Sequence, residues 1–164
     1  MVRVEVFGLA LDEKSQAPVL ILKAVDGERI LPIWIGAMEA MAISVALNKV
    51  AFPRPMTHDL LLNVLRGLGG QVSCVEVTSV EEGTFFAEIV IRKGEETLRM
   101  DSRPSDAMAL ALRAEVPLFV HEKVLEQAGT MTPGAYEAVL KSEDADKWTE
   151  ELEKLSENGN KYKM

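Results

Sequence analysis

The sequence is poor in the residues on which disulfide-bonded and metal-bound small domains depend. Its 164 residues include one cysteine, Cys74, so neither an internal disulfide nor a cysteine-based structural zinc site can form within the chain. It has only two histidines, His58 and His121, which excludes a multi-histidine metal site in one subunit. No apolar run approaches the roughly 18 residues that a membrane-spanning helix needs, and residues 1–6 alternate like a strand instead of forming a signal peptide. These absences predict a cytoplasmic protein with no membrane segment.

Positive charge is also scarce. Lysine and arginine total 18 against 26 aspartates and glutamates, which gives a formal net charge of −8. A protein that coats nucleic acid by neutralising phosphates is expected to have the opposite balance. Any phosphate chemistry here would therefore need a metal ion or a local group of arginines.

Several common catalytic motifs are missing. The sequence has no glycine-rich phosphate loop, no Cys-x-x-Cys pair, no His-Glu-x-x-His and no Gly-x-Ser-x-Gly. What it does have is 48% apolar and 27% charged residues, the balance of a globular domain. The candidate chemistry then rests on carboxylates, two Arg-Pro pairs and one His-Asp dipeptide.

An internal repeat organises the first 115 residues. An offset of 67 positions aligns similar segments of the chain, and the matches are Gly27 with Gly94, Glu28 with Glu95, Leu31 with Leu98, and residues 40–42 with 107–109. Each copy, at about 2–50 and 71–115, has the pattern of three strands followed by an apolar helix. Short connections make neighbouring strands antiparallel.

The predicted elements follow from this pattern. Strands are expected at 2–9, 18–25, 29–35, 71–80, 84–92, 95–101 and 117–120, and helices at 37–49, 57–68, 105–113 and 121–128. Thr57 and Ser105 stand where helix N-caps are expected. Because the repeat helices are apolar on most sides, the predicted fold class is α+β, a duplicated β-β-β-α unit with antiparallel-rich sheets packed around apolar helices.

The end of the chain differs in character. Residues 142–164 contain seven acidic and four basic residues, with Trp148, Leu152 and Leu155 at helical spacing. We expect a domain at 1–141 and an acidic tail at 142–164 that forms one amphipathic helix.

The first candidate site is the segment 101–106. Asp101, Arg103, Ser105 and Asp106 gather where a strand meets a helix N-terminus, whose free N–H groups favour anions. Asp101 and Asp106 could hold a divalent metal while Arg103 and Ser105 bind a phosphate. The alternative is structural, with Ser105 as the cap, Asp106 answering the helix dipole and Asp101 paired with Arg103.

A second candidate is Glu39, which the repeat offset places on Asp106. The two carboxylates would share a metal ion if the helix starts meet, and otherwise each stabilises its own helix.

The third candidate is the segment 54–59. Arg54 could bind phosphate, while His58 and Asp59 are candidates for proton transfer. Since adjacent residues on a helix do not face each other, His58 and Asp59 are not expected to pair. The alternative is a capped helix with a solvated histidine.

Two further residues are assigned to packing. Trp34 alternates with apolar neighbours in a strand, with stacking on a base as the alternative interpretation, and Cys74 lies in an apolar strand.

Taken together, residues 31–40 (LPIWIGAMEA), 54–60 (RPMTHDL), 83–87 (GTFFA) and 101–107 (DSRPSDA) resemble the bifunctional nuclease domain family. The resemblance covers about residues 1–128. It implies a small α+β domain on a duplicated β-β-β-α unit, often dimeric, that cleaves RNA and DNA. It supplies no agreed catalytic residues.

The leading hypothesis is a homo-oligomeric phosphodiesterase that cleaves nucleic acid, with a dimer favoured. Carboxylates of Glu39, Asp101 and Asp106 would hold Mg²⁺ or Mn²⁺. His58, Asp59 and Asp106 are the candidate catalytic residues, and phosphate would bind to Arg54, Arg103 and Ser105. The alternatives are a non-catalytic homo-oligomeric regulatory or binding domain and a small-molecule anion binder.

Overall fold

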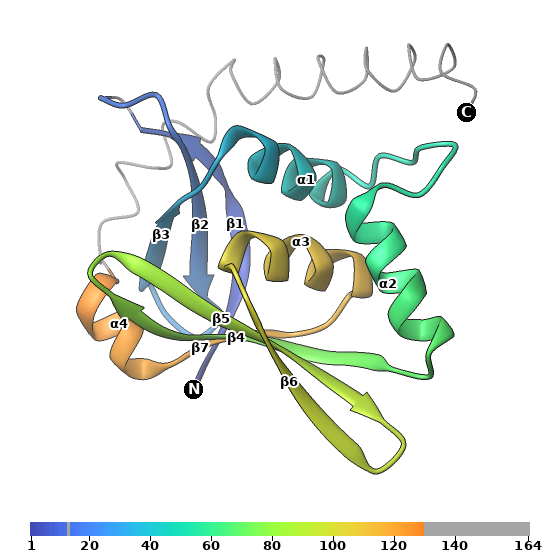
Figure 1. Ribbon diagram of the computed structural model, residues 1–164. Helices are drawn as coiled ribbons and strands as arrows, with labels where there is room; N and C mark the ends of the chain where they lie inside the picture. The colour runs from blue at the N-terminus through green and yellow to red at the C-terminus, as the bar shows by residue number, and fades with distance from the viewer. Residues whose placement is uncertain (13, 130–164) are drawn as a thin grey trace.

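Seven strands form a single sheet in the computed structural model, which describes residues 1–12 and 14–129 (Figure 1). The strands are β1 (Val2–Leu11), β2 (Pro18–Ala24), β3 (Ile30–Trp34), β4 (Gln71–Glu81), β5 (Thr84–Lys93), β6 (Glu96–Ser102) and β7 (Leu118–Val120). The helices are α1 (Ala37–Leu47), α2 (Thr57–Gly67), α3 (Pro104–Ala114) and α4 (Glu122–Ala128). The α+β class is confirmed, and every described element lies within two residues of its predicted bounds.

The strand order is β3-β2-β1-β7-β4-β5-β6. Strands β1 to β3 and strands β4 to β6 pair as two antiparallel sets, as the short connections predict. The short strand β7 joins the sets, antiparallel to β1 and parallel to β4, so one sheet forms where several were expected. Both sets run as three strands and a helix, while their origin by duplication stays a prediction.

Helices α1 and α3 pack against each other over this sheet, and α2 packs against α3 (Figure 1). Their apolar side chains explain the arrangement, because Ile43 of α1 and both Met108 and Leu110 of α3 are completely buried. They join Leu20 and Val75 of the sheet in one core. The starts of α1 and α3 are thereby held close together, and this places the candidate site.

Helix α4 lies against β3 and β4. His121 is its N-cap, and Glu122 forms an ion pair with Arg29 at the start of the β3 segment. Among the described residues, no helix is long and apolar enough to cross a bilayer. The domain boundary at 141 and the predicted helical tail lie outside the described residues.

Several local predictions were wrong. The N-caps are Met56 and Arg103, so Thr57 is the first residue of α2 and Ser105 lies inside α3 behind Pro104. Proline suits the first turn of a helix because it has no N–H to leave unpaired, and this moves the start of α3 forward. Trp34 is 53% exposed at the end of an edge strand instead of packing in the core.

Cys74 is also not a core residue. It is only partly buried, and its Sγ lies 3.8 Å from Oε1 of Glu76. Burial, and then the Glu76 carboxylate, raise the pKa of the Cys74 thiol.

Candidate functional site

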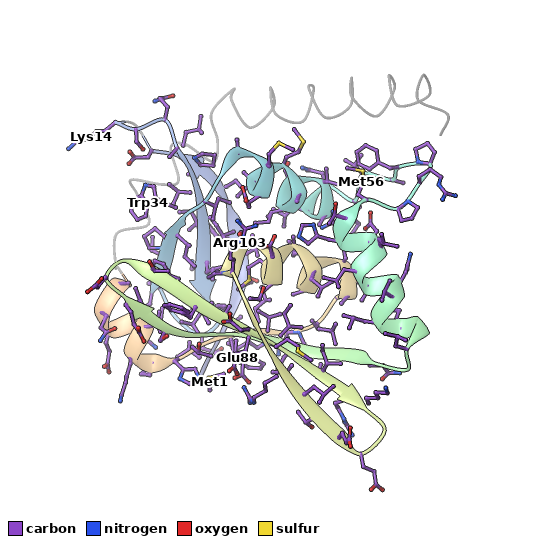
Figure 2. All side chains as sticks on the ribbon, viewed as in Figure 1. Met1, Lys14, Trp34, Met56, Glu88 and Arg103 are labelled. Atoms are coloured by element: carbon purple, nitrogen blue, oxygen red, sulfur yellow. The ribbon has the colours of Figure 1, made fainter. Side chains whose placement is uncertain are left out.

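The three candidate segments meet at one pocket of about 260 Å³ between α1, α3 and the start of α2. Glu39 comes from α1, His58 from α2, and Asp106 from the start of α3, where Arg103 is the N-cap (Arg103 is labelled in Figure 2). The full lining is Met38, Glu39, Met41, Ala42, Val45, Phe52, Met56, Thr57, His58, Arg103, Asp106 and Arg113. Residues that lie up to 75 positions apart in the sequence, from Met38 to Arg113, therefore share one cavity.

Arg103 connects the two carboxylates of the pocket. Its Nε donates to Oδ2 of Asp106 at 2.7 Å, and its Nη1 donates to Oε1 of Glu39 at 2.9 Å. The hydrogen bond to Asp106 is the main cause that raises the pKa of Arg103 above its usual value. Nη2 donates to none of the described residues, so this cationic group keeps donors available for an anion.

His58 is held by Asp106. Its Nε2 lies 3.2 Å from Oδ1 of Asp106, and its side chain is mostly buried. Burial raises the pKa of Asp106, but hydrogen bonds from Arg103 and His58 outweigh this effect and leave the pKa below its usual value. Since an ionised carboxylate can only accept, Nε2 of His58 donates and Nδ1 is left to take a proton.

Asp59 points to a different partner. Its Oδ1 accepts from Nε of Arg113 at 2.7 Å, and its Oδ2 accepts the backbone N–H of Met56 at 2.9 Å. Arg113 also donates from Nη1 to the backbone oxygens of Ala42 and Ala109. The expectation that His58 and Asp59 do not pair is confirmed, and Asp59 fastens the first turn of α2 to α3.

The other predicted site residues lie outside the pocket. Asp101 is exposed on β6 opposite Glu88, and the predicted structural pair between Asp101 and Arg103 does not form. Ser105 is buried inside the first turn of α3. Arg54 lies in the loop before α2, exposed and without an ion pair to any described residue.

The predicted metal ligands do not converge in this arrangement. Glu39 and Asp106 are near one another, but the Arg103 guanidinium binds both, and Asp101 is absent from the pocket. Within residues 1–12 and 14–129, no three side chains of histidine, cysteine, aspartate or glutamate form a metal-binding group. As arranged, these carboxylates fit an arginine better than a shared metal ion.

Gly36 allows Glu39 to reach Arg103. A Cβ at Gly36, the N-cap of α1, would lie 2.2 Å from Oε2 of Glu39. The carboxylate therefore folds back over its own helix start, where only a glycine leaves it room.

Sequence reasoning missed two features of the pocket. Arg113 was not singled out, although it follows Asp106 by seven residues and so lies on the same face of an otherwise apolar helix. The wall formed by Met38, Phe52 and Met56 was also missed, because single apolar residues in a helix and a loop resemble core positions.

A family model described as the bifunctional nuclease domain matches residues 20–133. An uncharacterized protein of Mycobacterium tuberculosis (strain H37Rv) is 36% identical over 160 residues, covering 95% of this chain and 96% of that protein. Bifunctional nuclease 2 of Oryza sativa subsp. japonica is 29% identical over 126 residues, and bifunctional nuclease 1 of Arabidopsis thaliana is 27% identical over 135 residues. These matches cover 74% and 75% of this chain but only 39% and 42% of the two plant proteins.

Proposed function

This chain belongs to the bifunctional nuclease domain family, and we propose on that premise that it hydrolyses phosphodiester bonds of RNA and DNA at the pocket between α1, α2 and α3. The observation that carries the proposal is the chain of contacts from His58 through Asp106 to Arg103. It joins a group that can take a proton to a group that can bind phosphate, inside one cavity.

The proposed chemistry follows from these contacts. Arg103 binds the non-bridging oxygens of the phosphate through its free donors and stabilises the charge that develops on them. His58, oriented by Asp106, takes a proton at Nδ1 from the attacking water as the water oxygen bonds to phosphorus. The P–O bond to the leaving oxygen breaks, and that oxygen takes a proton from solvent. Because water is the nucleophile, a 2′-hydroxyl is not required, which suits a nuclease that acts on both RNA and DNA.

A divalent metal is not assigned a step, because the carboxylates are bound to Arg103. The dependence on Mg²⁺ or Mn²⁺ therefore stays a prediction, as does substrate binding by Arg54 and Ser105. Catalysis by Asp59 is likewise untested, although both its oxygens already have partners.

The test is cleavage of labelled single-stranded RNA and DNA by the purified chain, with Mg²⁺, Mn²⁺ or EDTA. His58→Ala is expected to lower the rate at least about 100-fold, the lower end of general acid–base contributions. The matched control is His121→Ala, which removes the other histidine at the start of α4 and should leave the rate unchanged. Equal cleavage by both variants would exclude His58, and no cleavage by the parent chain would exclude the nuclease.

A second candidate function is favoured by the outer face of α2. Leu60, Leu61, Val64 and Leu68 are large apolar side chains that remain exposed, and 60, 64 and 68 form one stripe along the helix. Two copies of such a stripe can pack as an antiparallel helix pair. The chain would then be a non-catalytic homo-oligomeric binding domain, or a dimeric nuclease if cleavage is also found.

Light scattering separates these outcomes. A dimer has twice the 18.1 kDa mass of the chain, and Val64→Lys is expected to return it to the monomer mass. A monomer at all concentrations would remove this candidate. The cytoplasmic location stays a prediction.

A further inference from the structure

The pocket has two chemically different walls. Arg103 and Asp106 at the start of α3, together with Glu39 of α1, form a charged wall, with His58 beside it. The apolar wall consists of Met38 and Met41 of α1, Phe52 of the loop before α2, and Met56 at its N-cap. Figure 2 shows Arg103 at the start of α3 and Met56 beside the start of α2.

We propose that this pocket takes one unpaired nucleotide of a single strand, with its base against the apolar wall and its phosphate at Arg103. This inference rests on the proposed nuclease function, since it names which part of the substrate enters the cavity. A phosphate would use only the free donors of Arg103 within the charged wall. The apolar wall needs a second group, and the group attached to each phosphate of a nucleic acid is a flat, polarisable base.

The side chains of the apolar wall suit a base. Phe52 contributes an aromatic ring to the lining, a group on which bases stack, and methionine thioethers are polarisable and pack well on aromatic rings. Met38 is 71% exposed and Met56 is also exposed, while Met41 and Phe52 are partly buried, so the described residues leave part of this wall uncovered. Beyond the charged wall of Glu39, Arg103 and Asp106, the neighbouring His58 and the paired Arg113, Thr57 is the one polar side chain of the lining, which predicts little discrimination among bases.

The size of the pocket sets a limit on the substrate. A volume of about 260 Å³ lies just below the roughly 300–1,000 Å³ of cavities that enclose drug-sized ligands. It has room for one base and not for a base pair. A base in a duplex would first have to leave its stack, which costs free energy, so an unpaired base enters more readily.

The charge distribution around the pocket supports a strand that continues beyond it. Between Glu39 and Glu76 the chain carries three basic residues, Lys49, Arg54 and Arg66, in a protein with a net charge of −8. The single acidic residue of that stretch is Asp59, which is paired with Arg113. Lys49 and Arg66 line a second hollow that shares Val45 and Arg113 with the pocket, so phosphates that flank the bound nucleotide would meet these two cations there.

The experiment measures binding separately from cleavage. The full chain carrying His58→Ala is titrated into a fluorescent single-stranded 10-mer of DNA and into the same sequence as a duplex. The duplex is expected to bind at least about tenfold more weakly. Phe52→Ala in the same background is expected to weaken single-strand binding between about five- and hundredfold, as for other base-stacking aromatic residues.

Phe86→Ala is the matched control, because Phe86 is a partly exposed phenylalanine on β5 outside the pocket. It should leave the affinity unchanged. Phe52→Trp should restore most of the affinity, and circular dichroism confirms that each variant is folded. Equal affinity for duplex and single strand, or equal effects of Phe52→Ala and Phe86→Ala, would overturn the proposal.

The same data separate this inference from the nuclease. Single-strand binding that depends on Phe52, without cleavage by the parent chain, rejects the nuclease and keeps the base site. Cleavage by the parent chain that is unaffected by Phe52→Ala rejects the base site and keeps the nuclease.

Discussion

The two partners of the ion pair between Arg113 and Asp59 are predicted to contribute unequally to stability. Asp59→Asn alters fewer atoms than Arg113→Met, yet it is expected to lower the free energy of unfolding more. The Arg113 side chain is 8% exposed, whereas the Asp59 side chain is 36% exposed. Asp59→Asn would leave a buried guanidinium with neutral acceptors only. Arg113→Met would keep most of the buried stem and leave a carboxylate that water can reach and that still accepts from Met56.

The magnitudes follow from that asymmetry. Removing one partner of a fully buried ion pair costs about 3–5 kcal/mol, since the other charge is left uncompensated. Two backbone oxygens still accept from Arg113, so we expect Asp59→Asn to cost about 2–4 kcal/mol. Arg113→Met should cost about 1 kcal/mol, because the stranded carboxylate is hydrated. The double variant should resemble Arg113→Met alone.

Thermal and urea unfolding followed by circular dichroism measure these differences. At about 3 °C for each kcal/mol, Asp59→Asn should lower the Tm by roughly 6–12 °C. Glu88→Gln serves as a control, since it breaks an ion pair with the exposed Arg99 and should change the Tm little. If Arg113→Met is as destabilising as Asp59→Asn, the burial argument is wrong. If Asp59→Asn abolishes cleavage at full stability, Asp59 is catalytic instead of structural.

Three further results are expected. Gly36→Ala should leave the Tm unchanged, because the backbone φ of −79° suits alanine. The variant should bind single-stranded DNA several-fold more tightly, because the new Cβ displaces the Glu39 carboxylate from Arg103. Unchanged affinity would contradict this. The lowered pKa of Asp106 stabilises the fold above about pH 4, so the loss of unfolding free energy in Asp106→Asn should be full at neutral pH and shrink as pH falls below 4 in urea titrations. The raised pKa of Cys74 predicts slow alkylation by iodoacetamide at pH 7.5, measured by mass spectrometry, and faster alkylation in Glu76→Gln.

The sequence specifies the individual elements well because local chemistry sets their bounds. Lys93-Gly94 places a residue with a φ of +61° between two alternating strands, and β5 and β6 end and begin beside it. Gly69 and Gly70 similarly end α2. Such turns depend on two or three residues that are adjacent in the chain, so periodicity and turn residues suffice to predict them.

The assembly of the sheet could not be predicted in the same way. It depends on β7, a strand of only three residues that pairs with β1 and β4 over separations of more than 40 positions. Nothing in the sequence Leu118–Val120 distinguishes an inner strand from an edge strand. The choice is made by burial of Leu118 and Val120 against the core, which is a property of the whole fold.

For the site as well, the residues could be predicted from the sequence but their partners could not. Residue type and position at helix starts predicted that Glu39, His58, Arg103 and Asp106 were candidates, and all four line the pocket. Their partners were not predictable, because a carboxylate of either repeat can bind a metal, a helix start or an arginine. The choice of Arg103 depends on how closely α1 and α3 approach, which follows from side-chain packing between them.

The offset of 67 residues that places Glu39 on Asp106 also places Gly36 on Arg103, and both are N-caps with extended backbone. If Gly36 were also an arginine, its Cβ would collide with the Glu39 carboxylate that lies over this position. If neither cap were an arginine, the neighbouring carboxylates of Glu39 and Asp106 would lose the cation that binds both. With one arginine, the group of Glu39, Asp106, Arg103 and neutral His58 has a formal charge of −1. A proton taken up by His58 in the proposed hydrolysis would bring the sum for these four side chains to zero. The difference between the two helix starts at this position therefore lets Glu39 and Asp106 share one cation.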